Sequence, residues 1–184
     1  MILPLPRDFY ARDAEAVAPD LLGKLLAHRV GGVLRVGRVV EAEAYLGEHD
    51  LAAHSSKGRT PRTEVIFGPP GHAYVYLIYG IHHCFNAVTG AEGEASAVLI
   101  RALEPVRNVE GNTRGPGLLC KALAIDRSCY GLDLVGDELF FAEPEERGGI
   151  EVVAGPRVGV DYAGEWAGKP LRFSIRGNPF VSRR

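Results

Sequence analysis

The clearest candidates for chemistry lie at the end of one predicted strand. Residues 33–45 are rich in valine and finish in Glu-Ala-Glu-Ala-Tyr, a pattern typical of a strand. Because side chains alternate along a strand, Glu41, Glu43 and Tyr45 share one face. The other face holds small apolar residues suited to a core, Val40, Ala42 and Ala44. Glutamates on strands are commonly solvated, but Glu43 lies where the strand ends and a long loop begins, so we expect it in a cleft.

That loop, residues 47–70, carries His54 followed by Lys57, Arg59 and Arg62. Loops of this length inside a compact domain are usually functional or disordered. The three cations suit an edge that contacts phosphates, and they equally suit an ordinary solvated loop. His54 alone would be interpreted as a surface histidine.

Residues 73–88 are aromatic and aliphatic and predict two strands joined around Tyr79-Gly80. Tyr74 and Tyr76 alternate onto one face, as tyrosines that pack on a sheet do. The ring of Tyr79 would protrude from a hairpin tip, where it can wedge between base pairs. Asn86, on the return strand, offers a donor and an acceptor on the same side as Tyr74 and Tyr76.

Two further features of the sequence concern charge and metal binding. Arg101 interrupts the apolar strand predicted over residues 96–103, and a buried arginine needs a carboxylate or a phosphate as its partner. Glu43 or Glu41 is the natural candidate for an ion pair. His82 and His83, followed by a cysteine, look like metal ligands, but adjacent strand residues point in opposite directions. We therefore predict no metal site and no cofactor.

The elements that must position these residues form an irregular α and β series. Helices are predicted over residues 14–28 and from Gly115-Pro116 through residue 125, and further strands over 138–142, 150–154 and 171–176. Strands outnumber helices, which favours an α+β fold. We expect a single mixed domain over residues 1–184, with a curved, mostly antiparallel sheet, flanking helices and a protruding β-hairpin.

Composition narrows the functional class. The chain is 46% hydrophobic and 24% charged, as ordinary globular proteins are. The net charge of −2 argues weakly against nucleic acid binding, but seven acids lie within residues 132–151 and the rest is net positive. No apolar run has the length of about 20 residues that spans a bilayer. The N-terminus lacks the features of a secretory signal, so we expect a cytoplasmic protein without a membrane partner.

Several common enzyme motifs do not occur in the sequence. It contains no phosphate-binding P-loop, dinucleotide-binding glycine motif, zinc-protease HExxH or serine-hydrolase GxSxG. The three cysteines form no Cys-x-x-Cys pair and are interpreted as buried or indifferent thiols.

Taken together, several blocks resemble the alkyladenine (3-methyladenine) DNA glycosylase family. They are EAEAYLGEHDLAAHS, TPRTEVIFGPPGHAYVYLIYGIHHCFN, VLIRALEP, RGPGLLCKALAID and GPRVGVDYAGEWAGKPLRFSIRGNPFVS, which occur in this order over nearly the whole chain after the first helix. The resemblance implies a single mixed domain with a protruding β-hairpin. It also implies an enzyme that repairs DNA by base excision.

The resemblance also implies roles for individual residues. Glu43 corresponds to the base that deprotonates the attacking water, and Arg101 to a residue that helps position that water or a flanking phosphate. Tyr79 corresponds to the ring that fills the vacated stack, and Asn86 to the amide that disfavours the exocyclic amine of guanine. The walls of the base pocket correspond to Tyr45, His54 and Tyr76.

These expectations describe a monofunctional, monomeric enzyme acting on duplex DNA that contains a damaged purine. It would flip an alkylated or deaminated purine of the 3-methyladenine type, with hypoxanthine and ethenoadenine as further candidates, and hydrolyse the N-glycosidic bond to leave an abasic site. Lys57 is the only lysine near these motifs, which argues against an amine nucleophile. Two alternatives stay open: a nucleic-acid-binding module without catalysis, and a hydrolase of free nucleosides.

Overall fold

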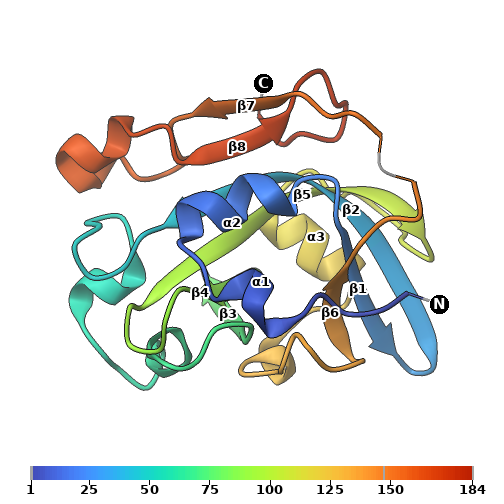
Figure 1. Ribbon diagram of the computed structural model, residues 1–184, viewed down its shortest axis with the longest axis horizontal. Helices are drawn as coiled ribbons and strands as arrows, with labels where there is room; N and C mark the ends of the chain where they lie inside the picture. Colours follow the sequence, from blue (N-terminus) through green and yellow to red (C-terminus); the bar gives the residue numbers. More distant parts are fainter. Residues whose placement is uncertain (1, 147, 184) are drawn as a thin grey trace.

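A curled antiparallel sheet dominates the computed structural model, which describes residues 2–146 and 148–183 (Figure 1). The main order of its strands is β3-β4-β5-β2-β1-β6, with β8 paired to β2 and β7 to β8. The strands are β1 (Leu25–Val30), β2 (Val33–Tyr45), β3 (Ala73–Ile78), β4 (His82–Thr89), β5 (Ser96–Arg107), β6 (Leu139–Ala142), β7 (Val152–Gly155) and β8 (Arg172–Ile175). The predicted α+β class is confirmed.

Short helices surround this sheet. They are α1 (Arg7–Tyr10), α2 (Ala14–Leu21), α3 (Pro116–Ala122) and the 3₁₀ helices η1 (His54–Lys57), η2 (Glu64–Phe67), η3 (Arg127–Cys129) and η4 (Asp161–Gly168). Helix α2 packs on β2 and β5, and α3 packs on β4 and β5. The main core lies between these helices and the sheet and includes Leu21, Phe85, Ile100 and Leu119. Both long central strands, β2 and β5, are therefore held on their apolar sides.

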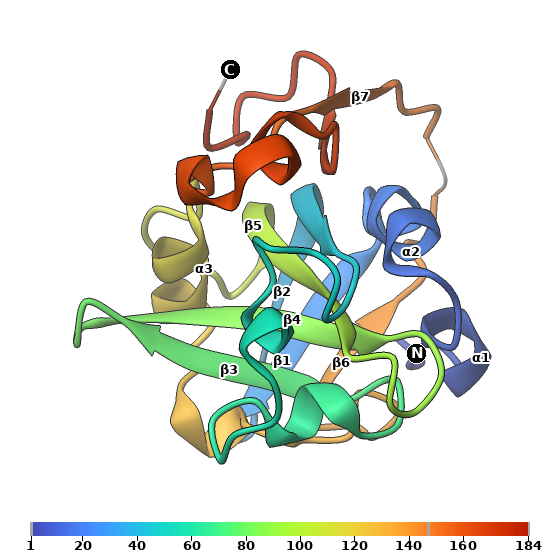
Figure 2. The same ribbon diagram turned by 90° about the vertical axis from the view of Figure 1, so that its left-hand side faces the viewer.

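The hairpin of β3 and β4 projects beyond the body of the protein (Figure 2). Its last paired residues are Ile78 and His82, so Tyr79, Gly80 and Ile81 form the tip. Tyr79 has a φ of 52°, in the left-handed region that bulky residues rarely occupy. The predicted pair of strands joined around Tyr79-Gly80 is confirmed.

Register shifts between β2 and β5 set the faces of both strands. Val39 opposes Leu103 and Glu41 opposes Ala102, which leaves Val40 as an extra residue on β2. A bulge turns the following side chains relative to regular alternation. Val39 therefore joins Ala42 and Ala44 in the main core, whereas Val40 packs in a separate cluster. The expectation that Val40 shares a face with Ala42 and Ala44 was wrong for this reason.

Three other predicted elements differ from the structure. The helix predicted over 14–28 ends at Leu21, because Leu22 is extended and Gly23 has a φ of +84°, and the following leucines belong to β1. The helix predicted through residue 125 ends at Ala122. Strand β5 continues past Pro105 to Arg107, because a register shift there lets a residue without an N–H fit into the ladder.

The loop over residues 47–70 is more ordered than its polar sequence indicates. It contains η1 and η2, and it buries Ile66 and Phe67 in a cluster with Tyr74 and Val88. This cluster fixes the loop against β3 and β4. Residues of the loop are thereby held beside the tyrosines of the hairpin.

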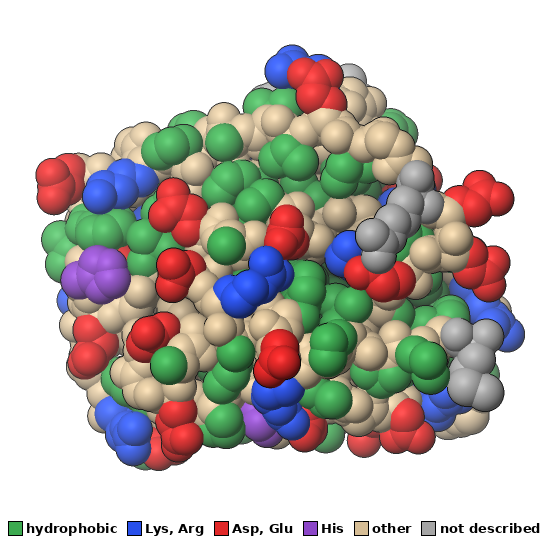
Figure 3. Space-filling view, in the orientation of Figure 1, with side chains coloured by type: hydrophobic (Ala, Val, Ile, Leu, Met, Phe, Trp, Pro, Cys, Tyr) green, Lys and Arg blue, Asp and Glu red, His purple; other side chains and the backbone are tan. Residues whose placement is uncertain are grey.

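The surface and the thiols give little indication of a partner. Acidic and basic side chains are mixed over the face seen in Figure 3, with acidic ones near the segment that leads to β7. Cys84, Cys120 and Cys129 are buried and free, as predicted. Among the described residues, no helix is long and apolar enough to cross a membrane.

The close approach of β2 and β5 gives a first testable prediction. A Cβ on Gly37 would lie 2.9 Å from Cδ1 and 3.0 Å from Cβ of Leu103, and the latter atom is fixed by the backbone. We expect Gly37→Ala to lower the free energy of unfolding by about 1–3 kcal/mol through overpacking. Urea denaturation measures this change.

Gly168→Ala is the matched control, because a Cβ there meets no atom within 4 Å. Its stability should stay within about 0.5 kcal/mol of the wild type. Equal stability of the two variants would show that the contact between β2 and β5 is looser than described.

Candidate active site

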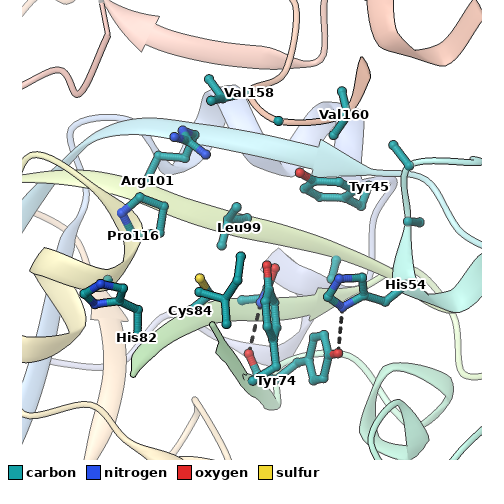
Figure 4. Close-up of a pocket in the computed structure, with 18 of the residues that line it drawn as sticks. Tyr45, His54, Tyr74, His82, Cys84, Leu99, Arg101, Pro116, Val158 and Val160 are labelled. Atoms are coloured by element: carbon teal, nitrogen blue, oxygen red, sulfur yellow. Dashed lines mark hydrogen bonds between the residues drawn. The ribbon is translucent and has the colours of Figure 1, made fainter. Parts of the chain in front are cut away.

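A cavity of about 920 Å³ opens beside the β3–β4 hairpin (Figure 4). Its walls come from the ends of β2 and β5, from β3 and β4, from η1, from the start of α3 and from residues 158–162. Ligand pockets commonly have volumes of about 300–1,000 Å³, so a single base would fit.

Most residues predicted from the sequence meet in this cavity. Those that line it are Tyr45, His54, Arg62, Tyr76, Tyr79, Asn86 and Arg101. Glu43 does not reach its surface, and Lys57 and Arg59 are not among the lining residues. The structure thus brings together residues that the sequence spreads from position 45 to position 101.

Glu43 lies directly behind the cavity wall and is fully buried. Its Oε2 accepts a hydrogen bond of 2.8 Å from the hydroxyl of Tyr45, and its Oε1 accepts one of 2.7 Å from the backbone N–H of Val158. The Nε of Arg101 lies 3.6 Å from Oε1. Tyr45, Val158 and Arg101, the neighbours of this carboxylate, all line the cavity.

The surroundings of Glu43 act on the pKa of its carboxyl in opposite directions. Burial is the largest influence and raises the pKa of its carboxyl, while the charge of Arg101 and the bonds from Val158 and Tyr45 lower it. Glu41, on the same strand, raises it further. The net result is a pKa of the Glu43 carboxyl above its ordinary value.

Arg101 owes its position to the same irregularity of the sheet. Glu41 opposes Ala102 and Ala42 opposes Ile100, so Arg101 is an extra residue on β5. Its Nε lies 3.5 Å from Oε1 of Glu41 and has no hydrogen-bond partner among the described residues. The sequence predicted an ion pair of Arg101 with Glu43 or Glu41, and the structure places Arg101 close to both.

Glu41 has partners that anchor the C-terminal part of the chain. It accepts a bond of 3.1 Å from Nη1 of Arg172 on β8 and one of 2.7 Å from the N–H of Ser182. With these bonds satisfied, Glu41 holds β8 and the following segment against β2. Its contacts are structural, in contrast to those of Glu43.

The aromatic wall is built from a histidine and two tyrosines. His54 shares a hydrogen bond of 2.9 Å with the hydroxyl of Tyr74, and its ring centroid lies 4.5 Å from that of Tyr76. Burial and, second, the charge of Arg62 lower the pKa of His54 to about 4, and burial raises the pKa of Tyr74 to about 12. At neutral pH this wall therefore carries no charge.

Asn86 lies at the inner end of the wall and is buried. Its Nδ2 donates a hydrogen bond of 3.1 Å to the backbone carbonyl of Tyr74 (Figure 4). That bond fixes the plane of the amide within the cavity. An amide side chain has one further donor and an acceptor oxygen beyond this bond.

Tyr79 stands at the mouth of the cavity and is 87% exposed. Ile81, beside it on the tip, is also largely exposed. The tip thus presents two large apolar side chains to solvent, and one of them belongs to a residue with a left-handed backbone conformation.

The loop cations have different surroundings. Arg62 lies over the ring of Tyr76, with 5.2 Å from its Cζ to the ring centroid, and belongs to the cavity wall. Arg59 lies over Phe67 and is paired with Glu64 at 3.3 Å. Lys57 is exposed at the end of η1. Whether any of them contacts phosphate stays a prediction.

Sequence reasoning missed the residues that support the wall from behind. Asp50 and Arg157 form a buried ion pair next to Tyr45, and the N–H of Val158 holds Glu43. Arg157 lies between Pro156 and Val158, and a charged residue in such an apolar stretch was the available signal. The role of a backbone N–H leaves no signal in the sequence.

A metal centre finds no support in the geometry. Over residues 2–146 and 148–183, no group of three or more histidine, cysteine, aspartate or glutamate side chains is placed to hold a metal ion.

Comparison with known proteins finds relatives that match nearly the whole chain. The family model described as "Methylpurine-DNA glycosylase (MPG)" matches residues 8–179. A relative from Legionella pneumophila is 55% identical over 97% of this chain and 98% of its own, and one from an Anaeromyxobacter species is 58% identical over 98% and 93%. A relative from Myxococcus xanthus is 55% identical over 97% and 93%. All three carry the name "Putative 3-methyladenine DNA glycosylase".

The neutral state of His54 can be tested directly. Because the charge of Arg62 lowers the pKa of His54, we expect Arg62→Ala to raise that pKa, while burial still keeps it below the ordinary value. Titration of the imidazole by NMR measures the pKa in each protein.

Arg59→Ala is the matched control, since this neighbouring arginine faces Phe67 and Glu64. It should leave the titration of His54 unchanged. An equal shift in both variants would contradict a specific influence of Arg62.

Proposed function

The chain belongs to the methylpurine-DNA glycosylase family, and we propose that it hydrolyses the N-glycosidic bond of alkylated purines flipped out of duplex DNA, with Glu43 activating the water. The observation that carries this proposal is the buried carboxylate of Glu43 behind a cavity walled by uncharged aromatic rings. A base must leave the stack before its glycosidic bond is accessible, which requires such a cavity.

Stacking on the aromatic wall offsets the cost of flipping. Extruding a base costs a few kcal/mol, and each contact with an aromatic ring returns about 1–3 kcal/mol. Tyr45 and His54 lie on different sides of the cavity (Figure 4), and the ring of Tyr76 packs against that of His54. A purine between them would be held by stacking, which depends little on the polar groups at the edge of the base.

The water is activated at the junction of Glu43 and Arg101. Each oxygen of Glu43 accepts one hydrogen bond from the protein and retains a further lone pair. The Nε of Arg101, which has no hydrogen-bond partner among the described residues, lies beside Oε1. A water there would accept from Arg101 and donate to Glu43, which removes its proton during attack on the sugar carbon.

The nature of the leaving group favours cationic purines. An N-alkylated purine such as 3-methyladenine carries a positive charge and leaves without further protonation. A neutral purine such as hypoxanthine needs an acid, and the wall supplies none, since His54 is neutral and the tyrosines of the wall hold raised pKa values. We therefore propose alkylated purines as preferred substrates over hypoxanthine and ethenoadenine.

In this proposal, Asn86 rejects undamaged guanine and Tyr79 helps to flip the nucleotide out of the duplex. The amide of Asn86, fixed by Tyr74, meets the edge of the base, and an exocyclic amine of guanine there would clash or leave polar groups unpaired. Tyr79 would enter the duplex and occupy the space left by the flipped nucleotide.

Two other functions explain less of the geometry. A binding module without catalysis needs the cavity and the hairpin but no buried carboxylate behind the wall. A hydrolase of free nucleosides needs the carboxylate but no exposed ring at the hairpin tip. Only base excision from a duplex uses both features.

Base release from defined duplexes tests the proposal. With a single 3-methyladenine in the duplex, the wild type should release the free base, and Glu43→Gln should slow the single-turnover rate by about 10²–10⁴-fold, the usual size of general-base assistance. Gel-shift titration should show that this variant still binds the damaged duplex. Undiminished release by Glu43→Gln would refute the assignment of the base.

The hairpin tip allows a second test. Tyr79→Ala should weaken excision from duplex DNA, because the vacated stack is left unfilled, whereas Tyr79→Phe keeps the ring and should remain near wild type. The same variants are assayed with the free nucleoside 3-methyl-2′-deoxyadenosine. A nucleoside hydrolase would cleave this nucleoside. Its Tyr79→Ala variant would keep wild-type rates on both the duplex and the free nucleoside.

The raised pKa of Glu43 predicts a pH dependence. Only the ionised carboxylate accepts a proton, so the rate on a cationic purine should rise with pH through the raised pKa and then level off. A pH profile of single-turnover rates measures this limb. A rate that falls as pH rises through the acid range would contradict a general base.

A further inference from the structure

A buried ion pair lies on the far side of Tyr45 from the cavity. Both side chains of Arg157 and Asp50 are without solvent exposure, and neither residue lines the cavity. Nη1 of Arg157 donates a hydrogen bond to Oδ2 of Asp50, and Nη2 donates one of 2.9 Å to Oδ1. This bidentate pair is the strongest form of an arginine–carboxylate contact.

Arg157 joins segments that are distant in sequence. Its Nη1 donates to the carbonyl of Ala44 at the end of β2, and its Nη2 lies 3.5 Å from the carbonyl of Trp166 in η4. Asp50, in turn, accepts from the N–H groups of Leu46 and Ala52 and so closes the turn after β2. The pair therefore fixes where the chain leaves β2.

The pair also contacts both hydrogen-bond donors of Glu43. The guanidinium of Arg157 lies over the ring of Tyr45, with 4.7 Å between its Cζ and the ring centroid. The next residue along the chain is Val158, whose N–H is bonded to Glu43. One arginine thus positions the hydroxyl donor through the ring and the amide donor through the backbone.

A buried ion pair needs a reason beyond stability. Apolar residues of similar volume often stabilise a fold as well or better, because both charges lose their hydration. A planar fork, however, can contact two carboxylate oxygens, two backbone carbonyls and a ring at once, which no apolar side chain can do.

We propose that the Asp50–Arg157 pair is a positioning element that orients Tyr45 and Val158 and thereby keeps the carboxylate of Glu43 ionised and aligned. The inference deepens the proposed function, on which it rests for its effect on base release. Arg157 and Asp50 do not touch the substrate or the reacting atoms.

The action of the pair has a definite sign. The bonds from Tyr45 and Val158 stabilise the ionised form of Glu43, so loosening them raises the pKa of the carboxyl. The other titratable or charged groups that face Glu43 stay in place: Glu41 on β2, Arg101 on β5, Tyr76 on β3, Cys84 on β4 and Arg172 on β8. A change in the titration of Glu43 then reports on its two donors.

Arg157→Lys is the central variant. Lysine keeps the charge but has no fork, so it cannot hold Asp50, Ala44 and Tyr45 together. We expect the pKa of Glu43, followed by ¹³C NMR of its carboxyl in the free protein, to rise. The single-turnover rate at pH 7 should fall by about 10–100-fold, the size of effect expected from slight misplacement of a catalytic group.

The pH profile separates positioning from a merely structural role. In Arg157→Lys the acid limb of the rate should move to higher pH, and the rate should recover partly at alkaline pH. Loss of folded protein alone would scale the whole profile down without moving it. An unmoved limb together with an unmoved titration of Glu43 overturns the inference.

Two further variants provide an independent test of the ion pair and a control for unspecific effects of an Arg→Lys substitution. Asp50→Asn keeps an oxygen acceptor for the turn but removes the charge that orients Arg157, and it should shift the titration of Glu43 in the same direction. Arg7→Lys, in the exposed pair with Asp133, is the control and should change neither titration nor rate. Equal shifts in the control and in Arg157→Lys also overturn the inference.

The two readouts keep this inference apart from the proposed function. If the wild type releases no base, the proposed function fails, while NMR titration of Glu43 in the free protein still decides whether the pair controls the carboxylate. If the wild type is active and Glu43 titrates identically in Arg157→Lys and Asp50→Asn, only the positioning role fails.

Discussion

Burial of a charged carboxylate is the constraint on which the rest of this structure depends. Glu43 and Glu41 are both inaccessible to solvent, and each would pay a large desolvation cost without partners. Arg101 lies between them and Arg172 adds a second cation at Glu41. The two pairs of opposite charges allow two acids to lie along one strand.

The curled sheet supplies the geometry that this arrangement needs. Bulges on β2 and β5 place Val40 and Arg101 as extra residues, so the charged side chains turn away from the main core while their neighbours stay in it. In a regular ladder, Arg101 would lie directly opposite a residue of β2 and its side chain would follow the strict alternation of faces along β5. The irregularity that made the faces of β2 hard to predict is also what assembles the charges.

The sequence was informative wherever local periodicity decided the outcome. The hairpin, the α+β class and the face shared by Glu43 and Tyr45 follow from alternation and turn residues, and the structure confirms them. Helix lengths were overestimated, because tertiary pairing with β2 and β6 drew Leu25 and Leu26 into β1. The supports of Glu43 were missed, since the Val158 donor is backbone and the pairing of Asp50 with Arg157 spans the fold.

Charge is segregated within the cavity, and this has consequences for the substrate. The rings of His54, Tyr74 and Tyr76 are neutral at physiological pH, and the guanidinium of Arg62 over Tyr76 is the cation beside them. The carboxylate of Glu43 lies instead behind Tyr45, Val158 and Arg101, and in the proposed reaction it faces the sugar of the flipped nucleotide. As the bond breaks, positive charge moves from the base to the sugar, and a fixed carboxylate there stabilises the transition state more than the bound substrate. In the proposed reaction, the rings hold the base and the carboxylate stabilises the charge that develops on the sugar, so the two serve separate steps.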